Sequence, residues 1–208
     1  MADYTFYTHP MSRGQIARWA LHEVDADYRQ VIVDWNNKSA DFLKANPMGK
    51  VPTIVHHVDG ADRCVTEAAA ICLYLAEMHP EKGLLPGDPD MADYYRWTFF
   101  AAGPVEQAIA ARGLKFEPLP EQEGMVGWGS FDRTFSTLGA FLAGTTWVCG
   151  ERFTMADVYM GSCVDWGLNF GVIPPEPSFV AYAERCQQRP AYKAAKAVDN
   201  ALIAEMKK

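Results

Sequence analysis

Long hydrophobic runs, clusters of basic residues and a basic-then-apolar leader are all missing from this sequence of 208 residues. No apolar run reaches the roughly 18 to 20 residues that a membrane helix needs. We therefore expect a cytoplasmic protein without a membrane partner. The formal net charge is −7. Because contacts to phosphates require clustered Lys and Arg, we also expect no nucleic-acid partner.

Closely spaced cysteines are missing as well. The chain contains five cysteines, which are Cys64, Cys72, Cys149, Cys163 and Cys186. An odd number with no short paired spacing favours neither a disulfide framework nor a zinc site. We therefore predict buried apolar thiols and no bound metal.

Strand and helix patterns alternate in the first part of the chain. Aromatic and β-branched residues at 4–7 predict a strand, and apolar residues at helical spacing over 16–24 predict a helix. Residues 28–33 predict a second strand. A hairpin over 53–65 and a helix that begins near Glu67 follow. This order predicts an α/β fold.

A stretch rich in Pro and Gly separates this part from the rest of the chain. Residues 80–90 show no periodicity, which is typical of a linker. Residues 91–208 are helical in pattern throughout, with a kink expected at Gly103-Pro104. We therefore predict an α/β domain over residues 1–79, a linker over 80–90, and an all-α domain over 91–208.

The most specific pattern is the run 46–52, which reads Asn-Pro-Met-Gly-Lys-Val-Pro. Pro52 cannot donate a hydrogen bond to a strand ladder, so it must begin the strand that follows. The Val51-Pro52 peptide bond is a candidate for the cis isomer. A cis bond would turn the backbone N–H and C=O of Val51 outward, where they are free to pair with an extended peptide. An ordinary turn proline is the alternative.

This run resembles a motif of the glutathione S-transferases, Asn-Pro-x-Gly-Lys/Gln-Val-Pro. The family's next motif, Glu-Ser-x-Ala-Ile, is similar to residues 67–71, and its Phe-Ser/Thr-x-Ala-Asp capping box is similar to residues 153–157. The resemblance covers both halves of the chain. It implies a thioredoxin-like N-terminal domain, an all-α helical C-terminal domain and a homodimer. A bacterial enzyme of the serine type, with a role in detoxification, is also implied.

The resemblance also implies that glutathione is the co-substrate. Val51, followed by Pro52, would pair with its cysteinyl backbone, and Glu67 would bind its α-amino group. Ala68 departs from the family pattern, in which a serine hydroxyl binds the γ-glutamyl carboxylate. Backbone N–H groups at a helix start also bind carboxylates, so we expect weakened rather than abolished glutathione binding. Two lysines, Lys38 and Lys50, are candidates for the glycyl carboxylate or the peptide backbone.

Ser12 is the predicted catalytic residue. A free thiol has a pKa of about 8.5, and lowering it by about two units needs roughly 2.7 kcal/mol of thiolate stabilisation. A hydroxyl that donates to sulfur at a helix N-terminus supplies part of this energy. Ser12 resembles the catalytic serine of serine-type transferases. The alternatives are that Ser12 only caps the helix and that Tyr7 donates to the thiol; His9 is expected to face solvent.

The predicted reaction is attack by the glutathione thiolate on a small hydrophobic electrophile. The candidates for the electrophile pocket are Met11, Tyr95, Phe99, Arg112 and Trp166. A glutathione-dependent isomerase or thiol-disulfide reductase is a second possibility, disfavoured because no cysteine lies near Ser12. A non-catalytic ligand-binding protein is a third, and Ala68 is the feature that favours it.

Overall fold

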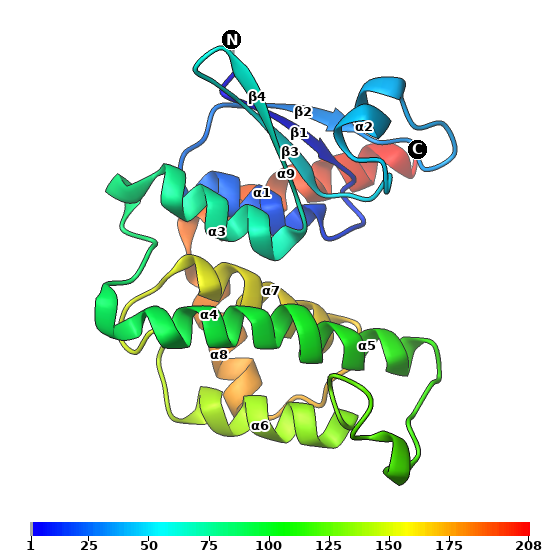
Figure 1. Ribbon diagram of the computed structural model, residues 1–208, viewed down its shortest axis with the longest axis vertical. Helices are drawn as coiled ribbons and strands as arrows, with labels where there is room; N and C mark the ends of the chain where they lie inside the picture. The colour runs from blue at the N-terminus through cyan, green and yellow to red at the C-terminus, as the bar shows by residue number, and fades with distance from the viewer. Residues whose placement is uncertain (1) are drawn as a thin grey trace. The chain divides into compact units, whose positions relative to one another are not determined.

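The chain folds into two compact units in a computed structural model that describes residues 2–208 (Figure 1). One unit contains the residues up to Gly83 together with Gln188–Lys208, and the other contains Leu84–Gln187. The C-terminal helix thus groups with the first unit, whereas the sequence patterns predicted that it belongs to an all-α domain over 91–208.

The first unit is built on a mixed sheet of four strands in the order β2-β1-β3-β4. The strands are β1 (Tyr4–Thr8), β2 (Tyr28–Ile32), β3 (Thr53–Val58) and β4 (Ala61–Thr66). The central strand β1 pairs in parallel with β2 and antiparallel with β3, and β3 forms a hairpin with β4. The hairpin turns at Asp59 and Gly60, both of which have positive φ.

Helices cover both faces of this sheet (Figure 1). On one face lie α1 (Gly14–Glu23) and α3 (Ala68–Met78), over buried residues such as Phe6. The short α2 (Ala40–Ala45) lies on the other face, where its Phe42 packs against Tyr7 and Val55. Phe6 and Tyr7 face opposite sides because successive side chains of a strand alternate. A three-residue turn, η1 (Pro80–Lys82), follows α3.

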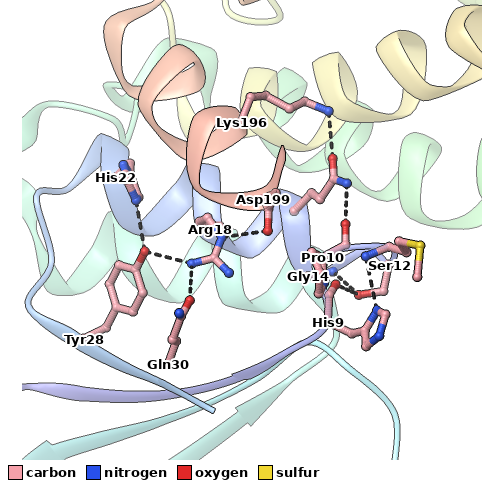
Figure 2. A network of polar contacts seen from close by, with 12 residues as sticks. His9, Pro10, Ser12, Gly14, Arg18, His22, Tyr28, Gln30, Lys196 and Asp199 are labelled. Carbon is pink, nitrogen blue, oxygen red and sulfur yellow. Dashed lines mark hydrogen bonds and ion pairs between the residues drawn. The ribbon is translucent and has the colours of Figure 1, made fainter. Parts of the chain in front are cut away.

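The C-terminal helix α9 (Pro190–Met206) joins this unit through a buried ion pair with α1 (Figure 2). Arg18 Nε donates to Asp199 Oδ1 over 2.9 Å, and both side chains are at most 1% exposed. The guanidinium also donates to Tyr28 Oη and Gln30 Oε1, each over 3.0 Å, and lies over the ring of Phe6. Because an isolated buried charge is costly, this pairing explains why α9 belongs with the sheet.

Two further contacts join α9 and the residue before it to α1. Arg189 donates two hydrogen bonds of 2.6 Å to the carboxylate of Glu23. The ring of Tyr192 meets Trp19 edge to face, with centroids 5.0 Å apart. Charge pairing and aromatic packing therefore extend along the α1–α9 contact.

The second unit is helical. Its elements are η2 (Asp88–Asp90), α4 (Met91–Phe100), the π-helical η3 (Ala101–Val105), α5 (Glu106–Gly113), η4 (Pro120–Gln122), α6 (Phe131–Ala143), α7 (Met155–Asn169) and α8 (Pro177–Gln188). The irregularity expected at Gly103-Pro104 takes the form of η3, which contains Pro104. The predicted capping box at the start of α7 is confirmed, since Thr154 N–H donates to Asp157 Oδ2 over 2.8 Å. Within residues 2–208, no helix has both the length and the apolarity needed to cross a membrane.

Candidate functional site

The sheet brings four chain segments to one of its edges. β1 ends at Thr8 and the parallel β2 ends at Ile32, opposite it in register. β3 begins at Thr53, which lies opposite Tyr7 of β1 and Thr66 at the end of β4. The segments that carry the predicted glutathione-binding residues all follow or precede these strand ends directly. Strand pairing alone therefore gathers them at the same edge.

The loop after β1 fixes the hydroxyl of Ser12 (Figure 2). Ser12 Oγ donates to the carbonyl of His9 over 2.6 Å and accepts from the N–H of Gly14 over 2.9 Å. Gly14 begins α1, and a Cβ at this position would overlap Thr8 Oγ1. The residue at position 14 must therefore be glycine for the loop to bring the half-buried Ser12 hydroxyl to the start of the helix.

The structure corrects the expectation for His9. Its side chain does not face solvent, because His9 is only 6% exposed and packs against Trp35, with the two rings tilted and their centroids 4.5 Å apart. Nδ1 accepts from the N–H of Met11 over 3.2 Å, and burial lowers the pKa of the imidazole. Met11 itself, a candidate for the electrophile pocket, is 58% exposed. Sequence reasoning missed Trp35, although an isolated Trp in the polar segment 34–39 was a usable signal.

The 46–52 loop is held from within by Asn46. This residue is 5% exposed, and its amide nitrogen donates to the carbonyl of Lys50 over 2.9 Å and to Thr53 Oγ1 over 3.0 Å. Its amide oxygen accepts from the N–H of Met48 over 3.1 Å. The side chain of Lys50 is exposed. Asn46 thus fixes the backbone on both sides of the loop, a role that the sequence motif alone did not reveal.

Val51 ends this loop with unpaired backbone groups. The Val51-Pro52 bond is cis, which decides between the two alternatives that the sequence left open. The N–H and C=O of Val51 make no hydrogen bond with any of residues 2–208. Lys38 lies beside the same loop, since a Cβ built on Gly49 would be 3.2 Å from Lys38 Nζ. A free donor and acceptor and a nearby ammonium group are therefore available at this point of the sheet edge.

Glu67 stands between β4 and α3 with a positive φ of 65°. Its carbonyl accepts from Ile71 N–H over 2.9 Å, while its exposed carboxylate has no partner within residues 2–208. Ala68 follows as the first residue of α3 and is buried. An unpaired carboxylate and the N–H groups of a helix start, which bind anions, therefore lie next to each other.

The other candidates for the electrophile pocket lie on three helices of the second unit. Tyr95 and Phe99 lie one turn apart on α4 and are 40% and 58% exposed. Arg112 lies near the end of α5, where its guanidinium carbon is 3.2 Å from the ring centroid of Phe131 in a cavity of 240 Å³. Trp166 of α7 packs edge to face against Phe170, the residue that follows this helix.

Known proteins share both this fold and this sequence pattern. Residues 2–77 match the glutathione S-transferase N-terminal domain, and residues 127–190 match the C-terminal domain. Glutathione S-transferase GstB of Escherichia coli K12 is 28% identical over 183 residues, covering 83% of this chain and 87% of that protein. GstA of E. coli O157:H7 is 27% identical over 178 residues, covering 82% and 86%.

Solved structures agree with these matches. A glutathione transferase of Methylococcus capsulatus superposes with a TM-score of 0.78 at 27% identity, covering 95% of this chain and 98% of that one. A sphingomonad glutathione S-transferase, solved in complex with glutathione, has a TM-score of 0.75 at 29% identity, covering 94% and 98%.

The chain belongs to the glutathione S-transferase family, and its general activity is that of a glutathione transferase. This confirms the family and the fold class that the sequence motifs predicted, a thioredoxin-like α/β domain followed by a helical domain. Among residues 2–208, no group of three or more His, Cys, Asp or Glu side chains is arranged to hold a metal ion.

Proposed function

We propose that this protein conjugates glutathione to a small hydrophobic electrophile, with Ser12 stabilising the thiolate. The observation that most supports the proposal is the free backbone of Val51, at the sheet edge where the Ser12 loop, Lys38 and Glu67 also lie. An exposed N–H and C=O on one residue match the backbone of an extended peptide, which pairs with them as an added strand would.

The charges around Val51 suit the two ends of such a peptide. The unpaired carboxylate of Glu67 suits the α-amino group of glutathione, and the first N–H groups of α3, from Ala68 onward, suit the adjacent carboxylate. Lys38, beside the loop, and the exposed Lys50 suit the glycyl carboxylate at the other end. Such contacts fix the peptide and so fix its sulfur.

Ser12 then has to donate its proton to that sulfur. The proton now points to the carbonyl of His9, so the hydroxyl must rotate toward the thiolate. The Gly14 N–H would keep Oγ in place during this rotation, because it binds the oxygen and not the proton. The positive end of the α1 dipole favours the anion at the same point.

Tyr7 is the alternative donor to the sulfur. Its ring packs against Phe42 of α2, with centroids 5.2 Å apart, and burial raises the pKa of its phenol. The ring belongs to the buried core cluster under α2, together with Val33 and Val55, which gives Tyr7 a packing role. This favours Ser12.

The test is a titration of bound glutathione, followed by thiolate absorbance across pH. We expect the thiol pKa in the complex to lie below about 8.5, the value of a free thiol, and to return toward it in Ser12→Ala. Tyr7→Phe is the matched control and should keep the lowered pKa. If Tyr7→Phe restores the free value while Ser12→Ala does not, Tyr7 is the donor and the assignment of Ser12 is wrong.

The proposal includes two properties that the sequence pattern predicted, a homodimer and a cytoplasmic location. Sedimentation equilibrium over a range of concentrations tests the first, and fractionation of cells that express the full chain tests the second. A role as a non-catalytic glutathione binder is favoured only by Ala68. Saturable glutathione binding without turnover of any tested electrophile would support that role instead.

A further inference from the structure

A cavity of 420 Å³ lies in the first unit, on the face of the sheet that α2 covers. Its walls come from all four strands and from α2, and they include the polar side chains of Thr5, Tyr7, Arg29, Asp41 and Lys44. None of the residues assigned above to glutathione lines it. The volume falls within the range of about 300–1,000 Å³ in which proteins bind small molecules.

One wall of the cavity is a connected hydrogen-bond network. His57 Nδ1 lies 2.6 Å from Asp62 Oδ1, and His57 Nε2 lies 2.9 Å from Thr5 Oγ1. The imidazole of His57 thus links the Asp62 carboxylate to the Thr5 hydroxyl. Thr5 Oγ1 in turn accepts from Arg29 Nη2 over 3.3 Å. This chain holds the Arg29 guanidinium at the cavity wall, and Asp62 is already occupied by His57.

Three charged groups of the lining have no ionic partner among residues 2–208. The only hydrogen bond of the Arg29 side chain within residues 2–208 is the one to Thr5. Lys44 and Asp41, both on α2, have neither a hydrogen-bond nor an ion-pair partner among the described residues. Asp41 and Arg29 both act on the phenol of Tyr7, whose pKa the first raises and the second lowers. The cavity therefore offers two cations and one carboxylate to a ligand.

We propose that this cavity binds a small amino dicarboxylate, with its two carboxylates on Arg29 and Lys44 and its ammonium group on Asp41. A dicarboxylate without an amine would leave Asp41 facing an anion. A monoamine or a simple amino acid would leave at least one of the two cations without a partner. The amino dicarboxylate is the smallest class of ligand that pairs all three charges.

Cys64 provides a direct report of occupancy. It lines the cavity and donates to the carbonyl of Ala45 over 3.0 Å, and it is exposed whereas the other four cysteines are buried. Partial burial raises the pKa of the Cys64 thiol, so we assign this thiol no chemistry in the site. Modification of Cys64 by N-ethylmaleimide, quantified by mass spectrometry, should slow when a ligand fills the cavity.

The first experiment compares three probes on the full chain, which are L-glutamate, glutarate and γ-aminobutyrate. Glutarate lacks the ammonium group, and γ-aminobutyrate lacks one carboxylate. We expect L-glutamate to protect Cys64, and each of the other probes to need about tenfold higher concentration, as the loss of one charged hydrogen bond implies. Equal protection by glutarate, or no protection by L-glutamate, overturns the proposal.

Variants then test the named charges by calorimetric titration with L-glutamate. Arg29→Gln and Asp41→Asn should each raise the Kd about tenfold, and Asp41→Asn should also strengthen glutarate binding. The matched controls are Arg63→Gln and Asp59→Asn, an exposed pair on the β3–β4 hairpin that does not line the cavity; these should leave the Kd unchanged. Circular dichroism of each variant checks that the fold is kept. An unchanged Kd in Arg29→Gln overturns the assignment.

A final arm separates this cavity from the glutathione site. The probe is S-methylglutathione, which cannot consume N-ethylmaleimide. Where it leaves the modification of Cys64 unprotected, it should also leave the Kd for L-glutamate unchanged, because the two sites share no residue. Competition without protection of Cys64 would mean that L-glutamate occupies the glutathione site, and the cavity proposal would be wrong even if the proposed transferase reaction were confirmed. Protection of Cys64 by S-methylglutathione would support the proposal, because this peptide carries the same three charges.

Discussion

Asp199 in the first unit and Asp157 in the second are both fully buried, and they are satisfied in opposite ways. Asp157 accepts four hydrogen bonds: from the N–H groups of Val148 and Thr154, and from the hydroxyls of Thr154 and Tyr182, over 2.7–3.0 Å. Asp199 relies on one charged partner, Arg18, and its Oδ2 has no hydrogen-bond partner among the described residues.

The difference between these carboxylates teaches how each unit is held together. Two of the four donors to Asp157 belong to a local capping box, so half of this network comes from residues that are neighbours in the sequence. Arg18 and Asp199 are 181 positions apart, and their pairing closes the first unit around both ends of the chain. Asp157 stabilises the start of α7, whereas Asp199 attaches the whole of α9 to the first unit.

The largest effect should come from breaking the pair in the first unit. Arg18→Leu leaves Asp199 as an uncompensated buried charge and should lower the free energy of unfolding by about 3–5 kcal/mol. Urea denaturation measures it. The double variant Arg18→Leu/Asp199→Leu is the control and should recover most of the loss, because both charges are then gone. A loss in the single variant below about 1 kcal/mol would mean that the pair does not hold α9.

The pH dependence of the free energy of unfolding tests the contribution of Asp157. Burial raises its pKa from 3.8 to about 6, despite the four donors. Between these values the folded protein binds more protons than the unfolded chain, so stability is lost as pH rises. We expect the contribution of Asp157 to the free energy of unfolding to fall by up to about 3 kcal/mol between pH 4 and pH 6.

The difference between the wild type and Asp157→Asn isolates this contribution, because the variant cannot titrate at that position. Urea denaturation at intervals from pH 3.5 to pH 7 provides both curves. Parallel curves would show that the pKa of Asp157 is the same in the folded and unfolded states.

At constant pH, Asp157→Asn tests the network itself. The amide places an N–H₂ group where an oxygen accepted hydrogen bonds, so at least one buried donor loses its acceptor. We expect a loss of about 2 kcal/mol in the free energy of unfolding near pH 7, where the carboxylate is ionised and accepts all four hydrogen bonds. Asp132→Asn, at an exposed position of α6, is the matched control and should change little. An effect as large as that of Arg18→Leu would contradict the contrast drawn between the two carboxylates.

The smallest effect should come from the periphery of the α1–α9 contact. Lys196 of α9 donates to Gln15 Oε1 over 2.8 Å, and Gln15 donates to the carbonyl of Pro10 over 2.5 Å (Figure 2). Lys196→Met should cost less than about 1 kcal/mol of stability, because such partly exposed contacts contribute little. Thermal unfolding measures it. A larger loss would show that the buried pair is not the main tie of α9.

Local sequence patterns predicted parts of both units. The alternation of strand and helix, the cis bond before Pro52 and the capping box at Thr154 each depend on a few neighbouring residues. Once the strands pair, Ser12, Val51 and Glu67 lie at one edge of the sheet, and no other long-range contact is needed to bring them there.

What the sequence did not predict depends on distant contacts. Trp35 reaches His9 across two loops, and the helical pattern of α9 does not reveal which unit it joins. The cavity under α2 is equally hidden, because no local pattern in the sequence indicates that Arg29 of β2 and Lys44 of α2 line one cavity.

The discontinuity of the first unit has a consequence for synthesis on the ribosome. Residues 84–187 are contiguous and are translated together, so the second unit has all of its residues before the chain ends. The first unit waits for its last segment, because Asp199 is made 181 residues after Arg18. Although the first unit begins to be translated first, the second unit should be complete earlier in a nascent chain. At that stage the sheet of the first unit still lacks α9.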